Sequence, residues 1–158
     1  MKKIVLPVLF VTCIWLVFSC HKDSKVIPAD YYFKASRNTL DWGATATTSI
    51  IPGDSIMFTA IRQSSAEQMN INIKFNGVGK YALAGGQASL LATGSDGITT
   101  SFRLDTTLGD TLIVKSYSTS THIAQGSFKI HFLKVSSDPN EYVPVFFDNG
   151  LFRVKMPE

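Results

Sequence analysis

Cysteine is nearly absent from this chain of 158 residues, and both copies, Cys13 and Cys20, lie within the first twenty positions. The rest of the chain can therefore form no disulfide and offers no thiol nucleophile or cysteine metal ligand. Histidine is also scarce, with three residues in all, and no GxSxG, HExxH or P-loop pattern occurs. Without a catalytic motif, we expect a protein that is not an enzyme and has no cofactor.

An excess of one charge sign is lacking as well. The chain has 15 basic and 12 acidic side chains, and without Lys2 and Lys3, which open the apolar leader, 13 basic ones remain. The basic residues form no cluster that could bind a row of phosphates. The composition therefore argues against a nucleic-acid partner.

Helical periodicity is the third absence, because no stretch of ten or more residues repeats apolar positions every 3.6 residues. Period-two alternation is present instead, most clearly in "MNINIKF" (69–75) and "GSFKIHF" (126–132). Shorter segments of the same kind lie at 55–62, 98–104, 111–117 and 151–156. These features predict an all-β fold, an antiparallel β-sandwich with a partly open β-barrel as the alternative.

Glycine-containing turns separate the expected strands. "NGVGK" (76–80) and "GSDG" (94–97) provide residues that adopt positive φ easily. Asn149-Gly150, between two apolar runs, predicts a terminal hairpin.

The first twenty residues resemble a bacterial lipoprotein signal peptide. Two lysines precede the apolar run Ile4 to Phe18, which is shorter than the roughly 20 residues of a membrane span. "VFSC" is similar to a lipobox, although Phe18 is bulkier than usual. The resemblance implies cleavage before Cys20, with diacylglycerol and a fatty acid such as palmitate on that residue. We expect a signal peptide at 1–19, a tether at 20–29 and one domain at 30–158. The alternatives for the N-terminal segment are cleavage before Cys13, an uncleaved anchor helix and a plain secreted protein without a lipid.

Aromatic residues are the main candidates for a binding surface. Tyr31, Tyr117 and Tyr142 are weak candidates for a platform on which a ligand ring could stack, although tyrosines in β domains more often fill the core. Trp42, the only tryptophan after the leader, is expected in the core.

Metal binding has little support. His122 and His131 lie nine residues apart and face opposite sides of an extended strand, so they predict surface roles and no zinc pair. Asp105, Asp110 and the "SDPNE" segment (137–141) could supply oxygen ligands for calcium, but their residue types are also those of turns. We therefore expect no metal site.

The order of segments resembles a family of small Bacteroidota lipoproteins whose domain has no known function. The similarity rests on the lipobox, on "GKYAL" (79–83), on "GSFKIHF" (126–132) and on "NGLFRV" (149–154). It implies a lipid-anchored protein of the cell envelope, placed at the outer membrane. Whether the domain faces the periplasm or the cell surface stays open, and the resemblance supplies no catalytic residues.

Three functions are compatible with these observations. The first is a lipid-anchored, non-catalytic binding or accessory domain for a glycan, a peptide or a partner protein. The second is a structural or assembly lipoprotein that pairs a strand edge with another envelope protein. The third, with the least support, is a glycosidase whose two carboxylates converge only in the fold.

Overall fold

The computed structural model describes residues 30–94, 97, 99–135 and 143–158, except for the side chain of Ser65. Within that part of the chain, no helix is long and apolar enough to span a membrane. Most of it is strand: β1 (Tyr32–Arg37), β2 (Leu40–Ile51), β3 (Ser55–Arg62), β4 (Glu67–Ile73), β5 (Gly79–Ala82), β6 (Ala88–Thr93), β7 (Thr99–Leu104), β8 (Thr111–Ser118), β9 (Ile123–Lys134) and β10 (Pro144–Lys155). A single 3-10 turn, η2 (Gln63–Ser65), joins β3 to β4.

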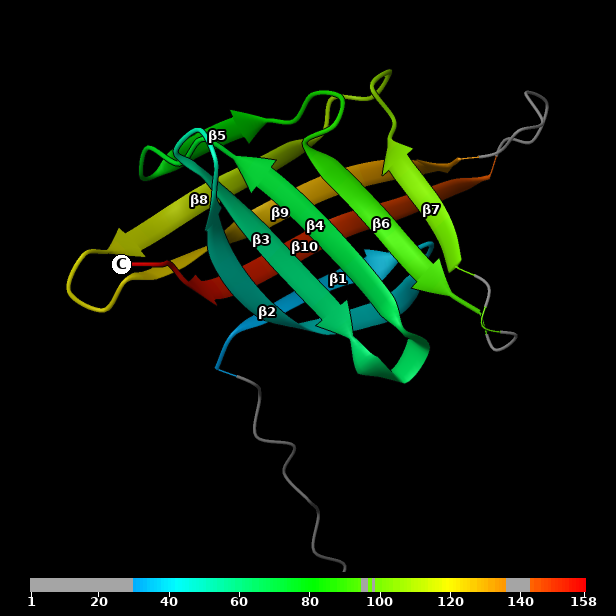
Figure 1. Ribbon diagram of the computed structural model, residues 1–158, viewed down its shortest axis with the longest axis horizontal. Coiled ribbons are helices and arrows are strands. Elements are labelled where there is room, and N and C mark those ends of the chain that lie inside the picture. The colour runs from blue at the N-terminus through cyan, green and yellow to red at the C-terminus, as the bar shows by residue number, and fades with distance from the viewer. Residues whose placement is uncertain (1–29, 95–96, 98, 136–142) are drawn as a thin grey trace, which may run out of the picture.

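The strands form one closed antiparallel barrel. Its order is β10-β1-β2-β3-β4-β6-β7-β9, and β9 pairs with β10 to complete the ring of eight strands. Strands β8 and β5 extend the sheet outward from the first half of β9. In Figure 1, β3, β4 and β6 cross in front of β9 and β10, which form the opposite wall.

The all-β prediction is confirmed, but the predicted sandwich is wrong. The alternative, a partly open β-barrel, is correct about the barrel and wrong only about its being partly open. Two features close the sheet. Strand β1 pairs with both β2 and β10, which joins the two ends of the described chain. Strands β2, β9 and β10 have twelve residues each. Bulges interrupt the ladders of β9 and β10, so these two strands can bend around the core.

The barrel interior is filled by side chains. Alternation is as predicted on β4 and β9, where Met69, Ile71 and Ile73, and Phe128 and Ile130, are buried. Trp42 is also buried, which confirms its expected place in the core. A close-packed interior of this kind is typical of small barrels, whose inward residues fill the lumen.

Phenylalanine rings make up the centre of this core. The ring of Phe33 lies 5.2 Å from Phe128 and 5.5 Å from Phe152, centroid to centroid. Phe152 in turn meets the edge of Phe58 at 5.8 Å. Such ring pairs add about 0.5–1.5 kcal/mol each beyond the area that they bury.

Two glycines make room for these rings. Gly126 pairs with Phe152 across β9 and β10, and Gly150 pairs with Phe128. A Cβ at Gly150 would lie 2.6 Å from the Phe128 ring. Each glycine therefore permits an aromatic ring to lie directly on the neighbouring strand.

The hairpin predicted at Asn149-Gly150 is wrong. Strand β10 continues through both residues, and its register with β9 shifts between Phe147 and Gly150. Asn149 has a φ of 52°. The same positive-φ preference that favours a turn here makes a bulge inside a long strand.

Candidate functional site

One end of the barrel carries an open hollow, named here the Tyr31 hollow. It is lined by Tyr31, Ala46, Thr47, Thr48, Lys155, Met156, Pro157 and Glu158. These residues come from the start of β1, the middle of β2 and the end of β10. The backbone N–H of Ala46 donates to Tyr31 O at 3.2 Å, which joins the first two segments. The N–H of Met156 donates to His122 O at 2.6 Å, which fixes the end of the third segment to the residue before β9.

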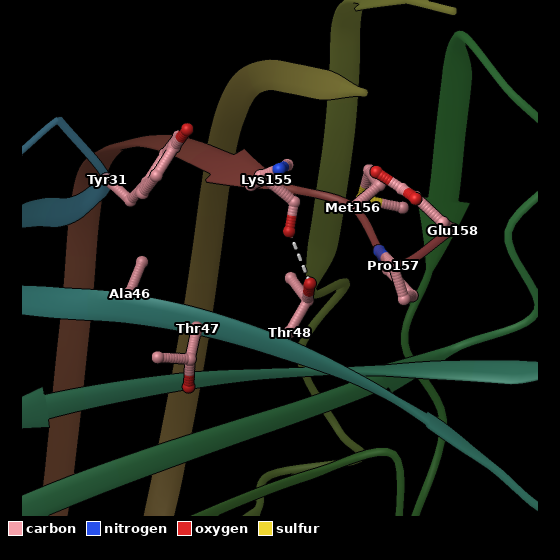
Figure 2. Close-up of a pocket in the computed structure, with 8 residues that line it drawn as sticks. All are labelled: Tyr31, Ala46, Thr47, Thr48, Lys155, Met156, Pro157 and Glu158. Carbon is pink, nitrogen blue, oxygen red and sulfur yellow. Dashed lines mark hydrogen bonds between the residues drawn. The ribbon is translucent and has the colours of Figure 1, made fainter. Parts of the chain in front are cut away.

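Apolar groups form the base of the Tyr31 hollow. Ala46 and Met156 are buried, and Tyr31 is partly buried against the core. Figure 2 shows Tyr31 and Ala46 on one side and Met156 and Pro157 on the other. The volume is about 450 Å³, within the range of small-molecule pockets.

Polar groups lie around this apolar base. The hydroxyl of Thr48 donates a hydrogen bond to the backbone oxygen of Lys155, which ties β2 to β10 (Figure 2). The charged residues Lys155 and Glu158 also line the hollow, whereas the side chain of Thr47 points away from Lys155 and Met156 (Figure 2). An apolar base with a few polar groups can hold and orient a ligand. The lining contains no histidine and no pair of carboxylates that could act as acid and base.

Tyr117 lies at the same end of the barrel but does not line the Tyr31 hollow. It is three strands from Tyr31, about 14 Å at the usual strand spacing. Its ring meets the edge of Phe75 at 5.2 Å, and Phe75 stacks on Tyr81. The structure therefore does not bring Tyr31 and Tyr117 together on one platform, and a ligand-binding role for either tyrosine stays a prediction. Tyr142, like Cys20, lies outside the described residues.

The predicted surface role of His131 is also wrong. Its side chain faces outward from β9, yet only 9% of it is exposed, because Asp110 and Phe146 cover it. Nδ1 of His131 lies 2.5 Å from Oδ1 of Asp110, and the backbone N–H of His131 donates to Oδ2 at 3.0 Å. On the other side of the ring, Nε2 lies 3.8 Å from Asp148, which also pairs with Lys129 at 3.5 Å.

The two aspartates near His131 have pKa shifts of opposite direction. Burial raises the pKa of the Asp110 carboxyl, against the opposing effect of its hydrogen bonds from His131. The pKa of Asp105 is lowered chiefly because the Thr107 hydroxyl donates to it at 2.6 Å. Both carboxylates thus have partners within the fold, and neither is presented as an open calcium ligand.

A buried ionic cluster closes the opposite end of the barrel. Glu67 is 4% exposed and lies 3.1 Å from Arg37 and 3.7 Å from Arg62. The indole N–H of Trp42 donates to the same carboxylate at 2.9 Å. This cluster joins β1, β2, β3 and β4, and a structural role accounts for all its contacts.

Metal-ligating residues do not gather in the described part of the chain, where no group of three or more His, Cys, Asp and Glu could hold an ion. The "SDPNE" segment (137–141), which suggested calcium, lies outside that part.

A family model described as a domain of unknown function, DUF6252, matches residues 29–155. The chain belongs to the DUF6252 family. The match begins just before β1 and ends with the last residue of β10, so it spans the whole barrel. No curated protein and no solved structure matches the chain. The expected kinship with an all-β domain of unknown function is confirmed, whereas the lipoprotein and bacterial assignments stay predictions.

Sequence reasoning missed most of the DUF6252 site. Ala46, Thr48 and Met156 belong to strands whose ends meet only in the closed barrel, so their proximity to Tyr31 has no sequence pattern. The Asp110–His131 pair spans 21 residues and has none either.

Proposed function

We propose that this DUF6252 protein is a lipid-anchored envelope lipoprotein whose barrel is a non-catalytic binding or accessory domain. Its ligand would be a glycan, a peptide or a segment of a partner protein. The observation that carries the proposal is the Tyr31 hollow, which combines a partly buried aromatic ring, an apolar base and peripheral polar groups. Pockets of this composition bind ligands by burial and a few oriented hydrogen bonds.

The anchor would place the hollow close to a membrane. Tyr31 follows the predicted tether at 20–29, and ten extended residues span at most about 35 Å. Acyl chains on Cys20 would therefore hold the hollow within that distance of the bilayer, at the outer membrane and on a face that the sequence leaves open. A ligand that belongs to the envelope is consistent with this position.

The assembly alternative has one specific feature in its favour. Strand β5 ends the sheet order, so one of its edges has no neighbouring strand within the described residues. That edge has only four residues, and Lys80 lies in it. Short, charged edges resist pairing with other chains, so we rank edge-mediated assembly below ligand binding.

The proposal is tested by a thermal-shift screen of residues 25–158 against oligosaccharides, peptidoglycan fragments and calcium. A ligand at a hundred times its Kd stabilises the folded state by about 2.7 kcal/mol, or about 5–10 °C for a domain of this size. The Tm of the Tyr31→Ala variant should be the same with the ligand as without it. Tyr117→Ala is the matched control, because it removes a partly buried tyrosine at the same end without touching the hollow.

The screen can also refute the proposal. Hydrolysis of an oligosaccharide by the wild-type protein would show that the protein is an enzyme and would refute a non-catalytic role. A shift that persists in Tyr31→Ala would place the ligand elsewhere. If no compound in the panel shifts the Tm, a small ligand is excluded, and a partner protein is the binding partner to search for.

A further inference from the structure

Basic side chains that are far apart in the sequence gather on one wall of the barrel. This wall, named here the basic wall, is the outer face of the five neighbouring strands β5, β8, β9, β10 and β1. Its basic residues are Lys34, Lys80, Lys115, Lys129, Arg153 and Lys155. Because they come from five different strands, no run of basic residues in the sequence indicates this wall.

The alternation on β10 and β1 turns three of these residues outward. Arg153 and Lys155 follow the buried residues Phe152 and Val154 on β10. Lys34 in turn follows a buried phenylalanine on β1. Since successive side chains of a strand point to opposite faces, all three lie on the outside of the barrel.

The other three basic residues lie on β9, β8 and β5. Ser127 and Lys129 flank the buried Phe128, so both face outward from β9. Lys80 on β5 lies two ladder steps from Ser127 and shares its face. Lys115 is exposed where a bulge interrupts β8.

Acidic residues hardly neutralise the basic wall. Its five strands contain one acidic residue, Asp148, which pairs with Lys129 at 3.5 Å. Lys34 lies over the Tyr32 ring, 4.7 Å from its centroid, and stays exposed. The other basic residues of the wall form no ion pair within the described part of the chain, and Nε of Arg153 has no hydrogen-bond partner there.

The opposite wall, formed by β3, β4 and β6, is neutral. These strands cross in front of β9 and β10 in Figure 1. The side chains that alternate with their buried residues are Met57, Thr59, Ile61, Gln68, Asn70, Asn72, Ser89, Leu91 and Thr93. None of them is charged, so an outer wall of this barrel does not need lysines to be polar, and the concentration of basic residues on one side calls for another explanation.

A broad positive wall fits an extended anionic surface better than one small anion. At the usual strand spacing the five strands are about 19 Å wide, so a single small anion would meet only a few of the basic residues. Lipid headgroups form such a surface, and they attract Lys and Arg over about 10 Å at 0.1 M salt. The first strand of the chain, β1, belongs to this wall and directly follows the predicted tether, so a lipid on Cys20 would keep the wall beside a bilayer.

We propose that the basic wall lies against an anionic lipid bilayer, so that the barrel rests on its side with the neutral wall facing away. The lipid anchor would supply proximity to the membrane, and the basic wall would supply the orientation. In this respect the inference rests on the proposed function. The contact itself depends on charge and is measurable without the anchor.

The test is flotation of residues 25–158 with vesicles of equal parts phosphatidylcholine and phosphatidylglycerol, and with vesicles of phosphatidylcholine alone. Residues 25–158 contain the whole closed barrel, whereas the full chain would float with any vesicle through its leader or its lipid. The wild type should bind the anionic vesicles only, and salt should weaken this binding.

Two charge-reversed variants separate the wall from net charge. Lys80→Glu combined with Lys115→Glu should weaken binding at least about tenfold. Lys74→Glu combined with Arg103→Glu is the matched control, because both of these residues are exposed, lie outside the five strands and remove the same charge. All four side chains are exposed, so an unchanged Tm is expected in both variants.

Each outcome bears on the proposal. Weakening by the first variant but not by its control supports it, and Tyr31→Ala should bind vesicles as the wild type does. The proposal is overturned if anionic vesicles do not bind at low salt, if both charge-reversed variants bind equally, or if neutral vesicles bind as well. Tighter binding of double-stranded DNA through the same lysines would also overturn it. Residues 25–158 lack Cys20, so this measurement and the test of lipid anchoring can fail separately.

Discussion

Replacing Gly126 with alanine should be among the most damaging small changes in this barrel. The added Cβ would lie 1.8 Å from the backbone oxygen of Ile113 and 2.8 Å from the ring of Phe152. Neither neighbour can move freely. The oxygen belongs to β8, which pairs with β9 at this point, and the ring is packed between Phe33 and Phe58. Strands β8 and β9 must therefore separate.

The cost follows from what the separation breaks. About two ladder hydrogen bonds around Gly126 would be lost at roughly 1 kcal/mol each, and crowding of Phe152 adds about 1–3 kcal/mol. We expect a loss of about 3–5 kcal/mol in the free energy of unfolding, measured by urea denaturation. Gly43→Ala is the control and should raise stability by about 0.5–1 kcal/mol, because its Cβ meets nothing. If Gly126→Ala unfolds within 1 kcal/mol of the wild type, the packing of β8, β9 and β10 described here is wrong.

Three further results are expected. Trp42→Phe should lower stability to urea by about 2 kcal/mol, because buried Glu67 loses its indole donor; an unchanged midpoint would contradict that bond. Thr107→Val should cost about 1 kcal/mol at pH 7, since the Thr107 hydroxyl lowers the pKa of Asp105. A lowered carboxyl pKa stabilises the folded state fully at pH values above 3.8, the ordinary pKa of the group, and this stabilisation is lost as the pH falls through the pKa of the folded state. The stabilities of the wild type and Thr107→Val should therefore converge in acid. A difference in stability that does not change with pH would refute the assignment. Cys20→Ala should release the protein from the membrane fraction, and retention would refute lipid anchoring.

Local pattern was enough to predict the strands. Alternation in 69–75 and 126–132 correctly predicted the buried apolar side chains from Met69 to Ile73 and from Phe128 to Phe132, because the two-residue period of a strand maps directly onto its two faces. Phe75, at the end of the first segment, is only partly buried. The burial of Trp42 followed from the general tendency of aromatic side chains in β domains to lie in the core. These features depend only on residues a few positions away in the chain, so a single sequence contains the information that predicts them.

Closure and the sites depend on contacts between distant residues. The pairing of β1 with β10 joins residues more than 100 positions apart, and alternation is the same whether a sheet closes or packs on a second sheet. Asn149-Gly150 illustrates a second limit, because one φ preference fits both a turn and a bulge. His131 illustrates a third limit. The two-residue period correctly predicted that its side chain points outward, but it could not predict that Asp110 and Phe146 cover that side chain.

The central claim is that this barrel binds a ligand in the Tyr31 hollow without transforming it. Its most direct test is to map ligand-induced shifts of the backbone amide signals by nuclear magnetic resonance. Pooled oligosaccharides and peptidoglycan fragments would be added to the ¹⁵N-labelled protein. The account predicts saturable shifts concentrated at Thr47, Thr48, Lys155 and Met156, with the added compounds recovered intact. Degraded compounds, shifts confined to other parts of the barrel, or an unchanged spectrum with every pool would contradict it.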